Sequence, residues 1–161
     1  MIVVVMGVSG AGKTTVGQAL ADALGWTFLD ADDFHAATSI EKMRRGEPLT
    51  DDDRGPWLDR LARLIAERRE QEPNTVLACS ALSAGHRAHL GLPLTDVPLV
   101  FLHGPEELLR ARLRARKAHF VGDALLTTQL ALLEPPADAI RIDVSDPVPV
   151  LVERIRAALT R

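Results

Sequence analysis

Cysteine and long apolar runs are nearly absent from this chain of 161 residues, and both absences limit what it can be. The single cysteine, Cys79, allows no internal disulfide, which fits a reducing compartment. No apolar run approaches the roughly 18 residues that span a bilayer, and no charged segment precedes apolar residues 2–6 as in a signal peptide. The net charge of -3 provides no general attraction to nucleic acid or anionic membranes. We therefore expect a cytoplasmic protein with neither as a partner.

Lysine is also scarce, because the lysines are Lys13, Lys42 and Lys117 and every other basic side chain is arginine. A biased base composition of the gene explains an arginine excess, yet a lysine kept in such a chain directs attention to its position. What is present is ordinary for a globular protein, with 47% hydrophobic and 25% charged residues. The length fits a single domain over residues 1–161 with its own core.

Strand and helix signals alternate along the chain. The expected strands cover residues 2–6, 26–29, 75–79, 97–102 and 140–144. The expected helices cover residues 13–24, 39–45, 50–69, 83–90, 105–116, 124–133 and 147–159. Such alternation predicts a three-layer α/β domain, in which helices cover both faces of a parallel sheet. Ligands of these sheets bind beyond the carboxyl ends of the strands, so the residues that directly follow strands are the candidates for function.

The first expected strand leads into the sequence GVSGAGKT, which fits the phosphate-loop pattern G-x-x-x-x-G-K-[ST]. Glycines allow successive backbone N–H groups to turn toward phosphate oxygens, and the helix that follows adds the positive end of its dipole. Lys13 would reach the β- and γ-phosphates, and the Thr14 hydroxyl would ligate Mg²⁺. The predicted ATP-binding residues are Gly7, Val8, Ser9, Gly10, Ala11, Gly12, Lys13, Thr14 and Thr15.

Two other interpretations of this turn are weaker. A dinucleotide-binding turn, G-x-G-x-x-G, would use Asp30 as its ribose-binding acid, but Thr15 stands where its third glycine belongs and Lys13 would have no role. A plain glycine-rich connection between a strand and a helix would need no Lys-Thr pair. The phosphate loop is therefore the favoured interpretation.

Acidic residues follow the second expected strand, where the chain reads Asp30-Ala31-Asp32-Asp33. Carboxylates beside a phosphate loop would repel ATP unless they face Mg²⁺ or a substrate hydroxyl. Asp30 is our candidate for the metal side, acting through a water molecule. A solvated acidic turn that caps the next helix is the alternative, above all for Asp33.

Longer motifs add a family resemblance. MGVSGAGKTTVG at residues 6–17, Asp30-Ala31-Asp32, His35 and IEKMRRGEPLTDDDRGPWL at residues 40–58 resemble the gluconate kinases, which are similar to shikimate and nucleoside-monophosphate kinases. ACSAL at 78–82, ARKAHF at 115–120 and LLTTQLALLEPP at 125–136 extend the resemblance over nearly the whole chain. It implies ATP- and Mg²⁺-dependent phosphorylation of the 6-hydroxyl of D-gluconate. It also implies a P-loop kinase fold with a five-stranded parallel sheet, a mobile lid near residues 117–123, and often a homodimer.

The resemblance also implies roles for individual side chains. Asp32 matches the second acid of the family's D-x-D and would orient the attacking hydroxyl as its base, while Arg116 at the base of the lid would neutralise charge on the transferred phosphoryl group. Arg112 would lie against adenine. The gluconate carboxylate needs a guanidinium, for which Arg54 and Arg87 are the first candidates. Weaker candidates for substrate contacts are Arg45, which competes with Arg44, and His35, which could instead be structural.

The sequence departs from the family at several places. Ser83-Ala84-Gly85-His86 replaces a basic stretch with a tyrosine, Ala36-Ala37 replaces a proline-containing stretch, and Val121 replaces a bulkier lid residue. Two other functions remain open. One is a related kinase that acts on shikimate, a nucleotide or another sugar acid, and the other is a nucleotide-binding protein without catalysis.

Overall fold

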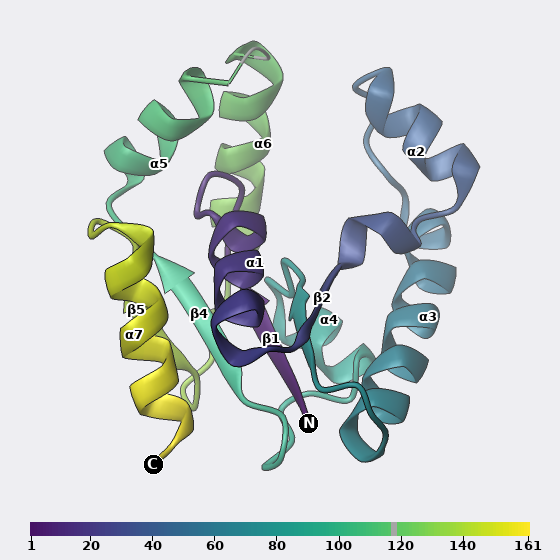
Figure 1. The fold of residues 1–161 in the computed structure, drawn as a ribbon. Helices are drawn as coiled ribbons and strands as arrows, with labels where there is room; N and C mark the ends of the chain where they lie inside the picture. The colour runs from purple at the N-terminus through teal and green to yellow at the C-terminus, as the bar shows by residue number, and fades with distance from the viewer. Residues whose placement is uncertain (117–118) are drawn as a thin grey trace.

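The computed structural model describes residues 1–116 and 119–161 and contains a five-stranded parallel sheet, as expected (Figure 1). The strands lie in the order β2-β3-β1-β4-β5. Their bounds are β1 (Ile2–Met6), β2 (Thr27–Asp30), β3 (Thr75–Ala78), β4 (Leu99–His103) and β5 (Ile140–Asp143). β1 is therefore at the centre of the sheet, and the loop that follows it lies between the loops that follow its neighbours β3 and β4.

The helices follow the expected alternation, with two differences. Their bounds are α1 (Lys13–Leu24), η1 (Ala31–Phe34), α2 (Ala37–Arg44), α3 (Asp51–Glu70), α4 (Ala84–His89), α5 (Glu106–Arg114), α6 (His119–Leu132) and α7 (Val148–Leu159). The 3₁₀ helix η1 was not expected. α6 begins at residue 119 instead of 124, so part of the predicted lid is helical, while residues 117 and 118 lie outside the described residues. None of the helices described is long and apolar enough to cross a membrane.

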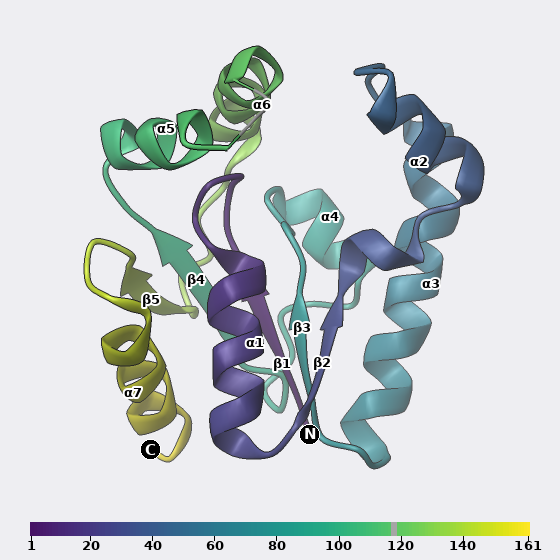
Figure 2. The same cartoon turned by 45° about the horizontal axis from the view of Figure 1, so that its top comes forward.

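The central strand separates two hydrophobic layers. Val3 and Val5 of β1 face the core under α1 and α7, and the alternate residues Ile2, Val4 and Met6 face the core under α3. All five are fully buried, which explains why β1 is apolar without interruption. Two helices extend beyond the carboxyl ends of the strands. α5 lies toward the β5 end of the sheet, and the end of α2 lies toward the β2 end (Figure 2).

Candidate functional site

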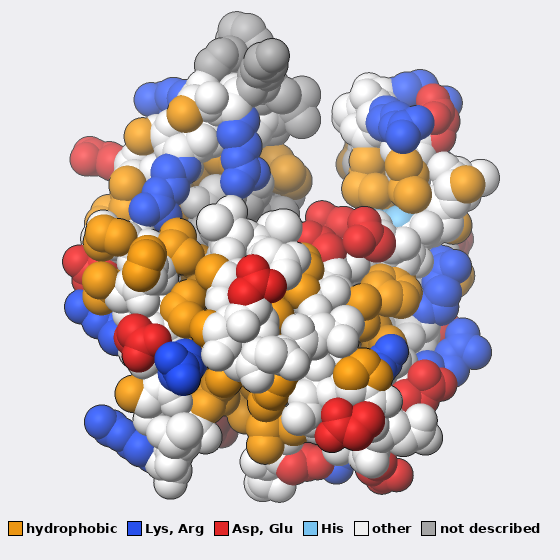
Figure 3. Space-filling view, in the orientation of Figure 1, with side chains coloured by type: hydrophobic (Ala, Val, Ile, Leu, Met, Phe, Trp, Pro, Cys, Tyr) orange, Lys and Arg blue, Asp and Glu red, His pale blue; other side chains and the backbone are white. Residues whose placement is uncertain are grey.

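The carboxyl ends of the parallel strands place the predicted site residues at one edge of the sheet. Gly7 follows β1, Ala31 follows β2 and Cys79 follows β3 along this edge. In the space-filling view this edge is hollowed between the α5–α6 side and α2, and acidic side chains gather near η1 at the foot of the hollow (Figure 3). The hollow is where a ligand of this fold is expected.

The phosphate loop has the backbone that its motif requires. Gly10 and Gly12 have φ angles of 86° and 89°, in the left-handed region that glycine adopts freely. At Gly10 an added Cβ would also lie 2.9 Å from the Leu109 carbonyl oxygen, so α5 leaves no room for a side chain. Lys13 Nζ donates a hydrogen bond to the Val8 carbonyl oxygen at 3.2 Å, which folds the lysine back over the loop.

Lys13 lies in an electrostatic cluster with three other predicted site residues. Burial lowers the pKa of Lys13, while the negative charges of Asp32 and Asp30 oppose this effect and the positive charge of Arg116 adds to it. These three charges that act on Lys13 come from two other stretches of the chain, the end of β2 with η1 and the residues just beyond the end of α5.

Thr14 and Asp30 form a pair of oxygen ligands beside the loop. Thr14 Oγ1 donates a hydrogen bond to Asp30 Oδ2 at 2.8 Å, and Asp30 Oδ1 accepts one from the Asp32 backbone N–H at 3.0 Å. Among the residues described, no group of three or more His, Cys, Asp or Glu side chains could hold a metal by itself. A hydroxyl and one carboxylate next to a phosphate site fit Mg²⁺, which usually completes its shell with water and substrate phosphates.

Asp32 presents its carboxylate to solvent above this pair, with its side chain 83% exposed. Protein atoms that surround the hollow still displace part of the water near this exposed carboxylate, which raises the pKa of Asp32, and the nearby charge of Asp30 raises it further. A raised pKa brings a carboxylate closer to the range in which it accepts a proton effectively near neutral pH. The η1 turn thus separates two carboxylates with different surroundings, one hydrogen-bonded to Thr14 and one free to meet a ligand.

Arg54 lies in the first turn of α3. Thr50 caps this helix, since its hydroxyl accepts from the Asp53 N–H at 3.1 Å and its own N–H donates to Asp53 Oδ2 at 2.9 Å. Arg54 Nη2 contacts the exposed Asp51 at 3.2 Å, but its Nε is buried with no hydrogen-bond partner among the described residues. Burial and the charge of Arg54 both lower the pKa of His86 on α4, which places His86 near this guanidinium.

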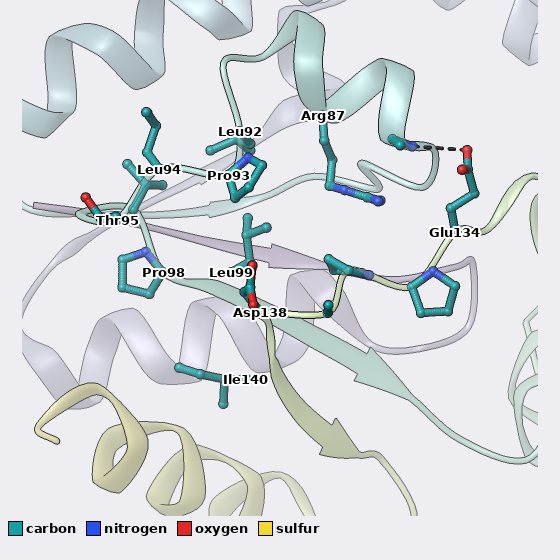
Figure 4. A pocket seen from close by; sticks show the side chains of 15 residues that line it. Arg87, Leu92, Pro93, Leu94, Thr95, Pro98, Leu99, Glu134, Asp138 and Ile140 are labelled. Carbon is teal, nitrogen blue, oxygen red and sulfur yellow. Dashed lines mark hydrogen bonds between the residues drawn. The ribbon is translucent and has the colours of Figure 1, made fainter.

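Arg87 takes a position different from the one expected of a substrate ligand. Its side chain is buried, and Nη1 donates to the Ala81 and Leu82 carbonyl oxygens, each at 2.9 Å. It lines a cavity of about 730 Å³ together with Leu92, Pro93 and Glu134, and no phosphate-loop residue reaches that cavity (Figure 4). The guanidinium is already committed to the loop after β3, so the structure favours a structural role over the expected contact with a carboxylate.

Other predicted arginines also have partners within the protein. Arg45 directly follows α2 and is half-exposed. Its Nε lies 3.0 Å from Glu47 Oε1, so its side chain pairs with a residue of the same turn. Arg112 Nη2 donates to the Val144 carbonyl oxygen after β5 at 2.6 Å, at the side of the sheet where adenine is expected. Arg110 and Arg114 of α5 both contact Asp123 of α6, at 3.5 and 3.4 Å. These ion pairs connect α5 to α6.

The sequence analysis assigned no role at the site to Gln129 or Trp57. Gln129 Oε1 accepts a hydrogen bond from the Ser9 backbone N–H at 2.6 Å, which ties α6 to the phosphate loop. Trp57 Nε1 donates to the Ala31 carbonyl oxygen at 2.7 Å, which ties α3 to η1. The signal for both was their place inside the family motifs at residues 125–136 and 40–58, because nothing in their local pattern reveals these distant partners.

Comparisons with known proteins agree with this geometry. The AAA domain family profile matches residues 2–136. A probable gluconokinase of Xenopus tropicalis is 42% identical and aligns over 100% of this chain and 94% of its own length. The crystal structure of a gluconokinase from Sinorhizobium meliloti 1021 is 41% identical, with a TM-score of 0.85 over 99% of this chain and 91% of that one. A shikimate kinase structure from Bacteroides thetaiotaomicron, at 21% identity, a TM-score of 0.65 and coverage of 100% and 99%, shares the fold alone.

Proposed function

Because this chain belongs to the gluconokinase family, we propose that it transfers the γ-phosphoryl group of ATP to the 6-hydroxyl of D-gluconate, giving 6-phospho-D-gluconate and ADP. The observation that carries the proposal is the cluster at the phosphate loop, where Thr14 is hydrogen-bonded to Asp30 at 2.8 Å, Asp30 accepts from the Asp32 N–H at 3.0 Å, and the charges of Asp30, Asp32 and Arg116 act on the buried Lys13. A phosphate cradle alone binds nucleotide, whereas a carboxylate and a second cation beside it supply what transfer to an alcohol needs. The cluster therefore favours a kinase over a nucleotide-binding protein without catalysis.

The reaction divides its tasks among these residues. The backbone N–H groups from Gly7 to Thr15 hold the phosphates, and Lys13 follows the charge on the transferred group. Arg116 approaches the same charge from just beyond the end of α5. Mg²⁺, when bound, neutralises charge on the phosphate oxygens, and Thr14 with Asp30, through water, would hold it. Asp32 orients the 6-hydroxyl of gluconate and accepts its proton as the oxygen–phosphorus bond forms.

Arg54 is the residue we assign to the gluconate carboxylate. Its buried Nε has no partner among the described residues, and its nearby carboxylate, Asp51, has a side chain 98% exposed, so this contact exchanges readily for a substrate. A planar guanidinium matches a carboxylate with two parallel hydrogen bonds. Arg45 would need to leave Glu47 to take part, and we place it at the rim of the site.

A substrate panel tests the proposed function. ADP release is measured with gluconate, shikimate, gluconate analogues that lack the 6-hydroxyl, and nucleoside monophosphates. We expect turnover with gluconate and none with the analogues that lack the accepting oxygen. Equal turnover with shikimate or a nucleoside monophosphate would contradict the proposed substrate, and ATP consumption that gluconate does not raise would contradict the kinase.

Matched substitutions distinguish the role of Asp32, which lies in η1, from that of Asp30, which caps η1. Asp32→Asn keeps the shape of the side chain but removes the proton acceptor, so kcat should fall about 10²–10⁴-fold while ATP binding is kept. Asp30→Asn should instead raise the Mg²⁺ concentration needed for half-maximal activity, because Asp30 is the carboxylate beside Thr14. If Asp32→Asn changed only the Mg²⁺ requirement, the two roles would be exchanged.

Three further expectations remain predictions. Closure of a lid near residues 117–123 over both substrates is one, and residues 117 and 118 of that stretch lie outside the described structure. A cytoplasmic location is another, supported by the single buried cysteine. A homodimer is the third, and sedimentation of the purified protein would test it directly.

A further inference from the structure

His35 lies directly behind the proposed base, between Asp32 and Trp57. Its ring stacks on the Trp57 indole with centroids 4.2 Å apart and planes inclined by 12°. The His35 side chain is only 5% exposed, which is too little for the direct contact with gluconate that the sequence suggested. Trp57 is itself fixed, because its Nε1 donates to the Ala31 carbonyl oxygen in η1 at 2.7 Å. The imidazole is therefore held in one orientation by α3, a helix distant in the sequence.

The surroundings of the ring determine where its proton lies. Nε2 is 3.9 Å from Asp32 Oδ1, and an ionised carboxylate only accepts hydrogen bonds, so a hydrogen bond between the two side chains requires the proton on Nε2. Nδ1 is buried and has no partner among the described residues. Burial lowers the pKa of His35, as does the nearby charge of Arg60, while Asp32 opposes both effects, and the neutral ring with one proton is favoured. We therefore assign the single proton of the neutral ring to Nε2, the nitrogen on the Asp32 side.

We propose that His35 is a positioning residue, which directs the Asp32 carboxylate toward the attacking hydroxyl through its Nε2–H. This inference rests on the proposed function, in which Asp32 is the base. The Asp32 side chain is 83% exposed, so without a fixed donor it would sample several rotamers. At 3.9 Å the pair is not yet hydrogen-bonded, and rotation of the exposed Asp32 side chain toward the immobile ring closes the gap. Such preorganisation of a reacting group raises kcat rather than substrate affinity.

A matched pair of substitutions separates this role from packing. His35→Gln places an amide nitrogen near the position of Nε2, whereas His35→Asn places it near Nδ1. We expect His35→Asn to lower kcat about tenfold, the loss of one hydrogen bond, and His35→Gln to retain most of the activity. The KM values for ATP and gluconate should remain unchanged in both. A rise in the KM for gluconate with kcat unchanged would overturn the inference, because it would indicate direct substrate contact.

A double-substitution cycle tests whether His35 acts through Asp32. In the Asp32→Asn background, His35→Asn should lower kcat no further, because the group that it positions is already disabled. Full additivity would overturn the inference while leaving the proposed base intact. An Asp32→Asn enzyme with normal kcat would instead contradict the proposed base, and with it this inference.

A third substitution guards against a loss of folding. His35→Phe keeps a flat ring against Trp57 and removes both nitrogens, so it should fold and show the same tenfold loss as His35→Asn. Thermal unfolding identifies any variant that is unfolded, and the kinetic comparison is then made with the folded one. A folded His35→Phe enzyme with normal kcat would overturn the proposal.

Discussion

The two sides of the site are built in different ways. On the nucleotide side, the phosphate loop connects the fully buried β1 to α1, and Val3 and Val5 of β1 lie in the core shared by α1 and α7. The acceptor side, where we place gluconate, consists of α2 and the start of α3. Its ion pairs, such as Arg45 with Glu47 and Arg54 with Asp51, are open to solvent. The first side is fixed by packing and backbone geometry, and the second by polar contacts that solvent can replace.

This difference suits the two substrates. The triphosphate of ATP is bound by backbone N–H groups, which must be preorganised because they cannot rotate toward it. Gluconate is small and rich in hydroxyl groups, and side chains that exchange one partner for another can bind it without rebuilding the core. Substitutions in the phosphate loop should therefore mainly change kcat, and those of the exposed side chains of α2 and the start of α3 should mainly change the KM for gluconate.

Among the substitutions that test this comparison of the two sides, Lys13→Ala should have the largest effect. Lys13→Ala removes the cation that follows the transferred charge, and kcat should fall by about 10²–10³-fold or more. The fold should survive, because burial lowers the pKa of Lys13 and its charge is thus unfavourable where it lies without ATP. Steady-state kinetics and thermal unfolding of the same variant measure both quantities. Activity within a few fold of the original enzyme would contradict the assignment.

An intermediate effect is expected at Arg54. Arg54→Ala should raise the KM for gluconate about ten- to a hundredfold, since a hydrogen bond to a charged group contributes roughly 1.5–3 kcal/mol, and the KM for ATP should hardly change. Arg45→Ala is the matched control at the rim of the site and should change the KM for gluconate far less. Arg87→Ala should instead lower the unfolding temperature, because the Ala81 and Leu82 carbonyl oxygens would lose their donor. An equal rise in both KM values for Arg54→Ala would indicate a general defect rather than a carboxylate site.

The smallest effect concerns the ion pair that joins α2 to α3. Lys42 Nζ lies 2.8 Å from Asp53 Oδ2, and the hydrogen bond from Lys42 is the main cause that lowers the pKa of Asp53 to about 2. This folded value lies below the roughly 3.9 of an unfolded aspartate. The pair therefore stabilises the fold at pH values above about 4, and its contribution is lost as the pH falls toward about 2.

Thermal unfolding as a function of pH checks this contribution. Between about pH 6 and about pH 2, the unfolding temperature of Lys42→Met should fall less steeply than that of the original protein, because the variant has already lost the pair. Arg44→Met is the control on the same helix, since the Arg44 side chain is 75% exposed and its Nη1 lies 3.9 Å from Glu41 Oε2. Parallel pH curves for Lys42→Met and the original protein would show that the pair contributes nothing.

Local sequence determined the nucleotide side almost completely. Continuous apolar residues specify a strand buried on both faces, and the structure has it at Ile2–Met6 as predicted. Helical spacing that stops at Gly25 specifies α1, whose bounds are also those predicted. The fold class followed from the alternation of such signals, and the reaction class from the resemblance of longer motifs to those of the gluconate kinases. In each case the information lies between near neighbours in the chain.

Tertiary structure alone decided which partners the polar side chains take. Arg87 and Arg54 looked equivalent in the sequence, yet Arg87 donates to two carbonyl oxygens after β3, whereas Arg54 keeps a buried Nε that has no partner among the described residues. The stacking of His35 on Trp57 depends on α3, which begins only at Asp51, so no local pattern around His35 announces it. A guanidinium or an imidazole can satisfy its hydrogen bonds in many ways, so its role is set by which groups the folded chain brings within reach.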